Sequence, residues 1–271
     1  MTAILLDIDG VLHVSGEAIP GAADAVGALR AAGHRLRFVT NNTTRARERL
    51  AAELRALGIE VEEDEVATTA VAAGKLLEGL RVLPVTMEAI HHDLARHVTL
   101  VDSDADAVLI GGADESVETE RVFAWTNLNR AFGELRDGAR LVSLHKNAWW
   151  QTSAGPLLDS GAFVAGLEYA AGVEAEVVGK PTAAYFEAAL ADLGTPPAEA
   201  VMVGDDVASD VGGAKALGMR GVLVRTGKFR EEALEAAEPK PDAVLDSIAD
   251  LPGYLARGRA RQGGGGVVGS I

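Results

Sequence analysis

Residues 3–11 read Ala-Ile-Leu-Leu-Asp-Ile-Asp-Gly-Val, an apolar run that ends in two acids. Such a run is typical of a buried strand, and alternate residues of a strand point to the same side. Asp7 and Asp9 are therefore predicted to meet at the carboxyl edge of a sheet, where open α/β folds bind ligands. Because neighbouring carboxylates repel each other unless a proton or a cation lies between them, the pair favours a divalent ion with oxygen ligands.

Helical and strand patterns alternate on both sides of a central segment. After the first strand we expect a helix over 21–32, a strand over 36–40 and a helix over 46–57, where Leu50 and Leu54 recur at helical spacing. The alternation returns later, with expected helices over 183–193 and 211–217 and strands over 200–203, 221–224 and 243–245. Strands joined by helical crossovers form parallel sheets. The fold class is predicted as α/β, with a doubly wound, Rossmann-like parallel sheet as the core.

The stretch between these halves is too long for a loop and has elements of its own. It holds expected strands over 82–85, 107–110 and 141–144 and expected helices over 119–132 and 163–171. We interpret it as an inserted α/β cap domain. The predicted organisation is a catalytic core of 1–72 and 179–260, a cap of 73–178, and a flexible glycine-rich tail of 261–271.

Composition excludes several classes of partner. The 271 residues carry 25 basic and 40 acidic side chains, a formal net charge of −15, which argues against nucleic acid and anionic membranes as partners. No apolar run approaches the roughly 18 residues that span a bilayer, and no basic segment indicates a signal peptide. The chain has no cysteine, which suits a cytoplasmic location and excludes thiolate chemistry.

Three more polar groups follow expected strands. Thr40-Asn41-Asn42 precedes a helix, Gly179-Lys180-Pro181 precedes another, and Gly204-Asp205-Asp206 is followed by Asp210. Two of them have a structural explanation, since Thr-Asn-Asn is a common helix cap and Gly-Lys-Pro a common solvated turn. Gly-Asp-Asp favours a metal site, because buried carboxylates rarely occur without partners. Acids, a hydroxyl, a lysine and further acids at one edge of one sheet together predict a site for Mg²⁺ and phosphate.

The motifs DIDGV, TNN, GKP and GDDVASD, in this order, resemble those of the haloacid dehalogenase superfamily of aspartate-dependent phosphotransferases. The stretches VVGKPTAAYF, MVGDDVASDVGGAKALGM and VLVRTGKF are similar to the branch of phospholysine/phosphohistidine/pyrophosphate phosphatases. The p-nitrophenyl phosphate and phosphoglycolate phosphatases are slightly more distant. The resemblance covers most of the chain except the glycine-rich tail. It implies a Mg²⁺-dependent phosphatase of a small phosphorylated metabolite, with a cap between the second and third motifs.

The resemblance also implies roles for individual residues. Asp7 would be the nucleophile that forms an aspartyl-phosphate, and Asp9 the general acid and base. Asp7, the Asp9 backbone carbonyl and Asp205 would bind Mg²⁺, while Asp210 would hold a metal-bound water.

For Asp206 the sequence leaves open a metal or a structural role. Thr40 and the Asn41 amide would hold the phosphoryl oxygens, and Lys180 would neutralise their charge.

Other candidate residues keep two interpretations. In the cap, His145, Lys146 and Trp150 lie in a loop that faces the active site in the family, which makes them candidates for substrate specificity. Two tryptophans beside a strand, Trp149 and Trp150, are more often cap core or a dimer contact than substrate contacts, and the resemblance allows a homodimer through the cap.

Elsewhere, His91, His92 and His97 are interpreted as a solvated helix face. Arg225 and Lys228 follow a strand end, where they support phosphate or simply lie on the surface.

Two rival functions fit part of the pattern. A non-catalytic protein that binds or senses a phosphometabolite could use the same scaffold, although such proteins typically lose the nucleophile or the acid–base residue. A receiver-like phosphoacceptor domain also combines Asp, Thr and Lys. In that family the acceptor lies on a later strand and no cap of this size is inserted.

Overall fold

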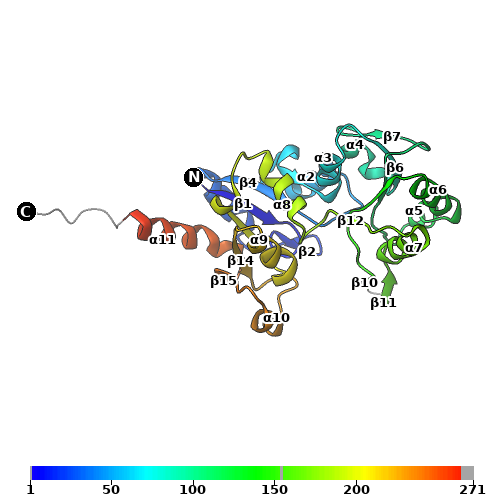
Figure 1. Cartoon of the computed structure of the whole chain (residues 1–271). Helices are drawn as coiled ribbons and strands as arrows, with labels where there is room; N and C mark the ends of the chain where they lie inside the picture. Colours follow the sequence, from blue (N-terminus) through cyan, green and yellow to red (C-terminus); the bar gives the residue numbers. More distant parts are fainter. Residues whose placement is uncertain (1, 153–154, 264–271) are drawn as a thin grey trace, which may run out of the picture. The chain divides into compact units, whose positions relative to one another are not determined.

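The computed structural model describes residues 2–152 and 155–263, and these form two compact units (Figure 1). Unit 1 comprises Met1–Arg37, Glu53–Val61 and Pro196–Ile271, and unit 2 comprises Phe38–Ala52 and Glu62–Thr195. Residues 264–271 of the predicted tail lie outside the described residues, and the structure places 261–263 at the end of a helix. The cap boundaries at 73 and 178 stay a prediction.

Unit 1 is built on parallel strands. Its central strands β1 (Ala3–Asp7) and β13 (Ala200–Gly204) pair in parallel, with Ala3 opposite Ala200. Next to β13 come β14 (Arg220–Val224) and then β15 (Ala243–Leu245), while β4 (Arg35–Val39) continues the sheet beyond β1. Every residue of β1 and β13 is buried, as expected for the middle of a parallel sheet.

The helices of unit 1 follow the predicted apolar spacing. Helix α1 (Ala22–Ala31) lies within the helix predicted over 21–32 and buries Ala25, Val26 and Leu29 at helical spacing. This unit also contains the hairpin β2 (His13–Val14) and β3 (Glu17–Ala18), a π-helical turn over Val207–Gly212, and the helices α9 (Gly213–Ala216), α10 (Glu231–Ala236) and α11 (Leu251–Gly263). Helix α2 (Arg47–Ala56) begins in unit 2 and ends in unit 1.

Unit 2 contains a second parallel sheet of five strands. Their order is β12 (Glu176–Val177), β9 (Arg140–Ser143), β8 (Ala107–Ile110), β6 (Arg81–Val85) and β7 (Thr99–Leu100), and all neighbouring pairs are parallel.

Helices α5 (Val117–Val122), α6 (Trp125–Arg136) and α7 (Gly161–Ala171) contribute to the core of this sheet. The antiparallel hairpin β10 (Trp149–Thr152) and β11 (Gly155–Leu158) completes the region.

Unit 2 also holds the segments on either side of this sheet. The last two residues of β4 pair in parallel with β5 (Val66–Ala67). Helices α3 (Thr69–Leu76) and α8 (Ala183–Ala191) contact each other, and α4 (His91–Leu94) contacts α3. No helix among residues 2–152 and 155–263 is both long and apolar enough to cross a membrane.

Parallel sheets with helical crossovers confirm the predicted α/β class. The single helix predicted over 119–132 is wrong, because α5 ends at Val122 and α6 begins at Trp125. At the break Phe123 is buried and stacks on Phe163, with ring centroids 4.4 Å apart, while Ala124 is extended. The helix predicted over 211–217 is likewise a π-helical turn followed by the short α9.

Candidate active site

Three acids of unit 1 form a buried cluster. Asp7 ends β1, Asp205 directly follows β13, and Asp210 lies in the π-helical turn after it. One carboxylate oxygen from each lies within 4.8 Å of the other two, and the three residues are 7%, 2% and 0% exposed. Carboxylate oxygens are the ligands that hard divalent cations prefer, so this donor set fits Mg²⁺. Asp210 was expected to hold only a metal-bound water, yet its carboxylate lies close enough to be a direct ligand.

Two glycines allow the acids to come together. A Cβ on Gly10 would lie 1.8 Å from Oδ2 of Asp205, and Gly10 also has a left-handed φ of +86°. A Cβ on Gly204 would lie 2.3 Å from Oδ2 of Asp210. Any larger residue at either position would therefore displace a carboxylate of the cluster.

The loop after β14 holds Asp205 through its backbone. The Lys228 N–H donates to Oδ2 of Asp205 at 2.6 Å, and Thr226 Oγ1 donates to the Gly10 carbonyl at 2.5 Å. Gly227, with φ +60°, leaves space for the same carboxylate. The sequence analysis considered only the side chain of Lys228 and missed this backbone contact. The neighbouring Gly227 could have indicated it, because glycine allows a close approach of the backbone. Arg225 pairs with Glu231 at 2.7 Å and lies over the ring of Phe229, so its side chain has a structural role.

The side chain of Asp206 caps the π-helical turn. Its Oδ1 accepts hydrogen bonds from the N–H groups of Ala208 and Ser209, both at 3.0 Å. Its own N–H donates to Oδ2 of Asp210 at 3.1 Å. Between the two roles that the sequence left open, this arrangement favours the structural one.

Asp9 lies in a different environment from Asp7. Its side chain is 60% exposed, and its Oδ1 lies 3.8 Å from Nε2 of the largely buried His13. An exposed carboxylate can exchange protons with water, which an acid–base residue must do. His13 was not singled out in the sequence, although it lies only four residues after Asp9, at the start of β2.

Unit 2 brings together Thr40, Asn41 and Lys180, the other predicted site residues. The Asn41 side chain makes two bonds to the backbone of Lys180: its Oδ1 accepts from the Lys180 N–H at 2.8 Å, and its Nδ2 donates to the carbonyl at 2.9 Å. A Cβ on Gly179 would lie 3.0 Å from the same Oδ1 and 2.5 Å from the Leu144 carbonyl oxygen, so a larger residue does not fit at this position. The side chain of Asn41 therefore positions Lys180, a role that the sequence did not predict.

Tyr185 fixes the backbone around Thr40. Its hydroxyl accepts from the Thr40 N–H at 2.8 Å and lies 2.9 Å and 2.7 Å from the carbonyls of Thr40 and Ala67. Tyr185 belongs to α8, so this one side chain joins a helix to the ends of β4 and β5. Thr40 is 1% exposed, and its Oγ1 accepts from the Asn42 N–H.

The three cap candidates occupy three different environments. His145 is buried, and a Cβ on Gly112 would meet both its Nε2, at 2.8 Å, and Oγ1 of Thr43, at 1.9 Å. Burial lowers the pKa of His145 although Asp159, 3.7 Å away, raises it.

The other two cap candidates contact residues of unit 2 outside the predicted phosphate site. Lys146 pairs with Glu168 on α7 at 2.7 Å, and Trp150 is half-buried opposite Leu157 in the hairpin. His145 is thus the cap candidate that lies next to the loop of Thr40 and Asn41.

Comparison with known proteins gives consistent matches. A model described as haloacid dehalogenase-like hydrolase matches residues 4–98, and one described as HAD-hydrolase-like matches residues 177–251. The chain is 40% identical over 255 residues to a phospholysine phosphohistidine inorganic pyrophosphate phosphatase of Xenopus laevis, covering 91% of this chain and 92% of that protein.

Solved structures agree over nearly the whole chain. The p-nitrophenyl phosphatase of Archaeoglobus fulgidus has a TM-score of 0.84 at 29% identity, covering 94% of this chain and 99% of that one. The glycerol phosphate phosphatase of Mycobacterium tuberculosis, solved in complex with magnesium, has a TM-score of 0.80 at 30% identity, covering 92% of this chain and 76% of that one.

Proposed function

Because the chain belongs to the haloacid dehalogenase-like hydrolases and is a phosphatase, we propose that it hydrolyses a small phosphorylated metabolite with Mg²⁺, through an aspartyl-phosphate on Asp7. The observation that carries the proposal is the buried cluster of Asp7, Asp205 and Asp210. Three carboxylates this close are costly in a protein interior unless a cation compensates them.

The chemistry would proceed in two displacements at phosphorus. The Asp7 carboxylate would attack, so that a bond from its oxygen to phosphorus forms while the bond from phosphorus to the leaving oxygen breaks. Asp9 would give its proton to that oxygen. Water would then attack the aspartyl-phosphate, Asp9 would take the proton from the water, and the bond between phosphorus and Asp7 would break. Acid–base assistance of this kind is worth about 10²–10⁴ in rate.

The charge of the phosphoryl group requires compensation by this chain. Lys180 and the Thr40 hydroxyl are the groups we assign to the phosphoryl oxygens, with Asn41 holding the Lys180 backbone in place. Asp7, Asp205 and Asp210, with the Asp9 backbone carbonyl expected from the family pattern, are the residues that would hold Mg²⁺. The bound ion would supply compensation for negative charge at the reacting phosphate.

The substrate class is part of the proposal. The named relatives act on phospholysine, phosphohistidine, pyrophosphate, p-nitrophenyl phosphate or glycerol phosphate, according to their names. These share a phosphoryl group on a small carrier, which is the class we assign here. No observation favours the non-catalytic alternative.

The test is release of inorganic phosphate from a panel of phosphometabolites and pyrophosphate, with Mg²⁺ and with excess chelator. Wild type should release phosphate only with Mg²⁺, and Asp7→Asn should show no measurable turnover. Asp137→Asn, at an exposed position after α6, is the matched control and should behave as wild type. Steady hydrolysis by folded Asp7→Asn would contradict the nucleophile, and a folded wild type that is silent on every compound would contradict the proposed function.

A further inference from the structure

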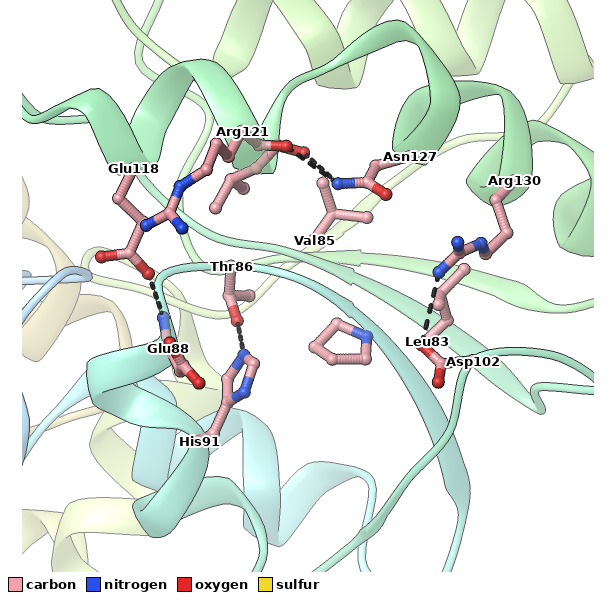
Figure 2. Close-up of a pocket in the computed structure, with 12 residues that line it drawn as sticks. Leu83, Val85, Thr86, Glu88, His91, Asp102, Glu118, Arg121, Asn127 and Arg130 are labelled. Atoms are coloured by element: carbon pink, nitrogen blue, oxygen red, sulfur yellow. Dashed lines mark hydrogen bonds and ion pairs between the residues drawn. The ribbon is translucent and has the colours of Figure 1, made fainter.

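A separate cavity of about 300 Å³ lies within unit 2, lined by β6 and by the segments around α4, α5 and α6 (Figure 2). None of the residues assigned above to phosphate or metal lines it. Leu83, Val85 and Val122 give it an apolar wall, and the rest of the lining is mainly polar. This volume is at the lower end of the range for small-molecule sites, which combine apolar walls with a few placed polar groups.

Hydrogen bonds fix several polar side chains of this cavity. Nδ2 of Asn127 donates to the carbonyls of Arg121 and Val122 at 2.9 and 3.3 Å, which leaves its Oδ1 as an acceptor. Oε1 of Glu118 accepts from the Glu88 N–H at 2.7 Å, and Thr86 Oγ1 lies 3.0 Å from Nε2 of His91 (Figure 2). These four side chains are thus held in place without a ligand, which reduces the entropic cost of binding one, whereas the side chains of Arg121 and Glu88 are exposed.

The charges of the lining are unequally compensated. Arg130 contacts Asp102 at 3.3 Å, whereas the Arg121 guanidinium makes no hydrogen bond or ion pair with any described residue. Burial lowers the pKa of His91 more than Glu88 and Glu118 raise it, so the imidazole is neutral near pH 7. One guanidinium and two carboxylates, of Glu88 and Glu118, therefore remain to meet a ligand. The interpretation of His91 as part of a solvated helix face is wrong, because it is half-buried and lines this cavity.

We propose that this cavity binds a small zwitterion of the free α-amino acid class. The ligand carboxylate would pair with Arg121, its ammonium group with Glu88 and Glu118, and its aliphatic part would lie on Leu83, Val85 and Val122. The two arginines and three acids of the lining sum to a charge of −1, which disfavours multiply charged phosphates. This charge balance distinguishes the ligand of this cavity from the substrate of the phosphatase site.

Calorimetric titration of the full chain with each common amino acid tests the proposal. Excess chelator is present throughout, so that coordination to a metal at the acid cluster cannot produce the signal. The matched probes lack the carboxylate, the ammonium group or both. They are a short-chain amine, a short-chain carboxylic acid and inorganic phosphate. At least one amino acid should bind with a Kd of about 1 mM or tighter, and each matched probe should bind more weakly.

Arg121→Gln should weaken that binding about tenfold or more, because a charge-assisted hydrogen bond is lost. Arg136→Gln, at an exposed position of α6 outside the cavity, should bind as wild type, and circular dichroism checks that both variants fold. Three results would each overturn the proposal. They are absence of amino-acid binding, equal binding by Arg121→Gln and wild type, and tighter binding of the amine, the acid or phosphate than of any amino acid. None of these results depends on phosphatase turnover.

Discussion

Gly10 shows how a residue without a side chain controls the acid cluster. A Cβ there would meet Oδ2 of Asp205 at 1.8 Å, whereas at Gly16, which has a similar φ of +82°, it would meet nothing within 4 Å. Alanine costs about 1–2 kcal/mol of backbone strain at either position. Gly10→Ala should in addition lower metal-dependent phosphate release by about 10²-fold, since displacements near 1 Å have this effect.

Gly16→Ala is the matched control for backbone strain and should keep its turnover. The measurement is kcat/KM for a phosphoester at saturating Mg²⁺, together with urea unfolding of both variants. Equal loss of turnover in the two would show that strain, and not the contact with Asp205, limits the site.

Asn41 offers a second prediction at this scale. Asn41→Asp replaces the Nδ2 donor by a carboxylate oxygen that repels the Lys180 carbonyl 2.9 Å away. We expect kcat/KM to fall about tenfold or more through displacement of Lys180. The control is Asn129→Asp at an exposed position of α6. Wild-type kinetics in folded Asn41→Asp would contradict the positioning role.

His145 should make stability depend on pH. Burial lowers its pKa in the folded protein below the ordinary 6.5. Between the folded and unfolded pKa values the unfolded chain binds more protons, so the free energy of unfolding rises with pH across that window. Stability is therefore lost as the pH falls from about 6.5 toward the lower folded value.

His145→Gln should reduce this slope, as measured by denaturant unfolding between about pH 5 and 8. The exposed His92→Gln is the control for loss of one imidazole. An unchanged slope in His145→Gln would contradict the role of burial at this residue.

Sequence patterns identify residues whose own side chains carry the site. Asp7, Asp205 and Asp210 were found because acids at strand ends are unusual, and the structure brings them together. The N–H of Lys228 could not be found in this way, because every residue except proline has a backbone N–H and the residue type therefore does not reveal its role.

At the level of elements, one hydroxyl joins α8 to β4 and β5. Tyr185→Phe removes a group that lies 2.7–2.9 Å from three backbone atoms of Thr40 and Ala67. We expect the free energy of unfolding to fall by about 1–3 kcal/mol, the cost of leaving a buried polar group unsatisfied. Tyr169→Phe, at a residue 92% exposed, should leave stability within about 0.5 kcal/mol of wild type. Urea unfolding compares the two, and equal effects would contradict the assignment.

Long periodic elements were predictable, whereas interrupted ones were not. Strands β1, β13 and β14 each contain a run of apolar residues, and their positions agree with the sequence to within a residue. The break between α5 and α6 depends on Phe123 stacking on Phe163, forty residues away in the chain. The two-residue strands β5, β7 and β12 are likewise fixed by pairing, not by their own composition.

At the level of the whole molecule, the acid cluster should couple thermal stability to Mg²⁺. Binding at a concentration of about 100 times Kd stabilises the folded state by roughly 2.7 kcal/mol, which corresponds to a rise in Tm of about 5–10 °C. Asp210→Asn should melt at a higher temperature than wild type in chelator, because it relieves repulsion among carboxylates within 4.8 Å of one another. It should also gain less from Mg²⁺.

Differential scanning calorimetry with and without Mg²⁺ provides the measurement, with Asp137→Asn as the control. An equal Mg²⁺-dependent shift in wild type and Asp210→Asn would exclude Asp210 from the metal site. The α/β class of the molecule could be predicted from its strand and helix patterns, but the residues at which the chain passes between the two units could not. The chain passes from one unit to the other after residues 37, 52, 61 and 195, and these positions depend on contacts between segments far apart in the sequence.

The discontinuity of unit 1 has a consequence for synthesis of the chain on the ribosome. β1 emerges long before its partner β13, which begins only at Ala200. At about 5–20 residues per second, β1 waits roughly 10–40 s for this partner. Most of unit 2 is one continuous stretch, residues 62–195, which is complete before β13 appears. The nascent chain therefore carries a fully apolar segment, Ala3–Leu6, that chaperones can engage until β13 has been synthesised.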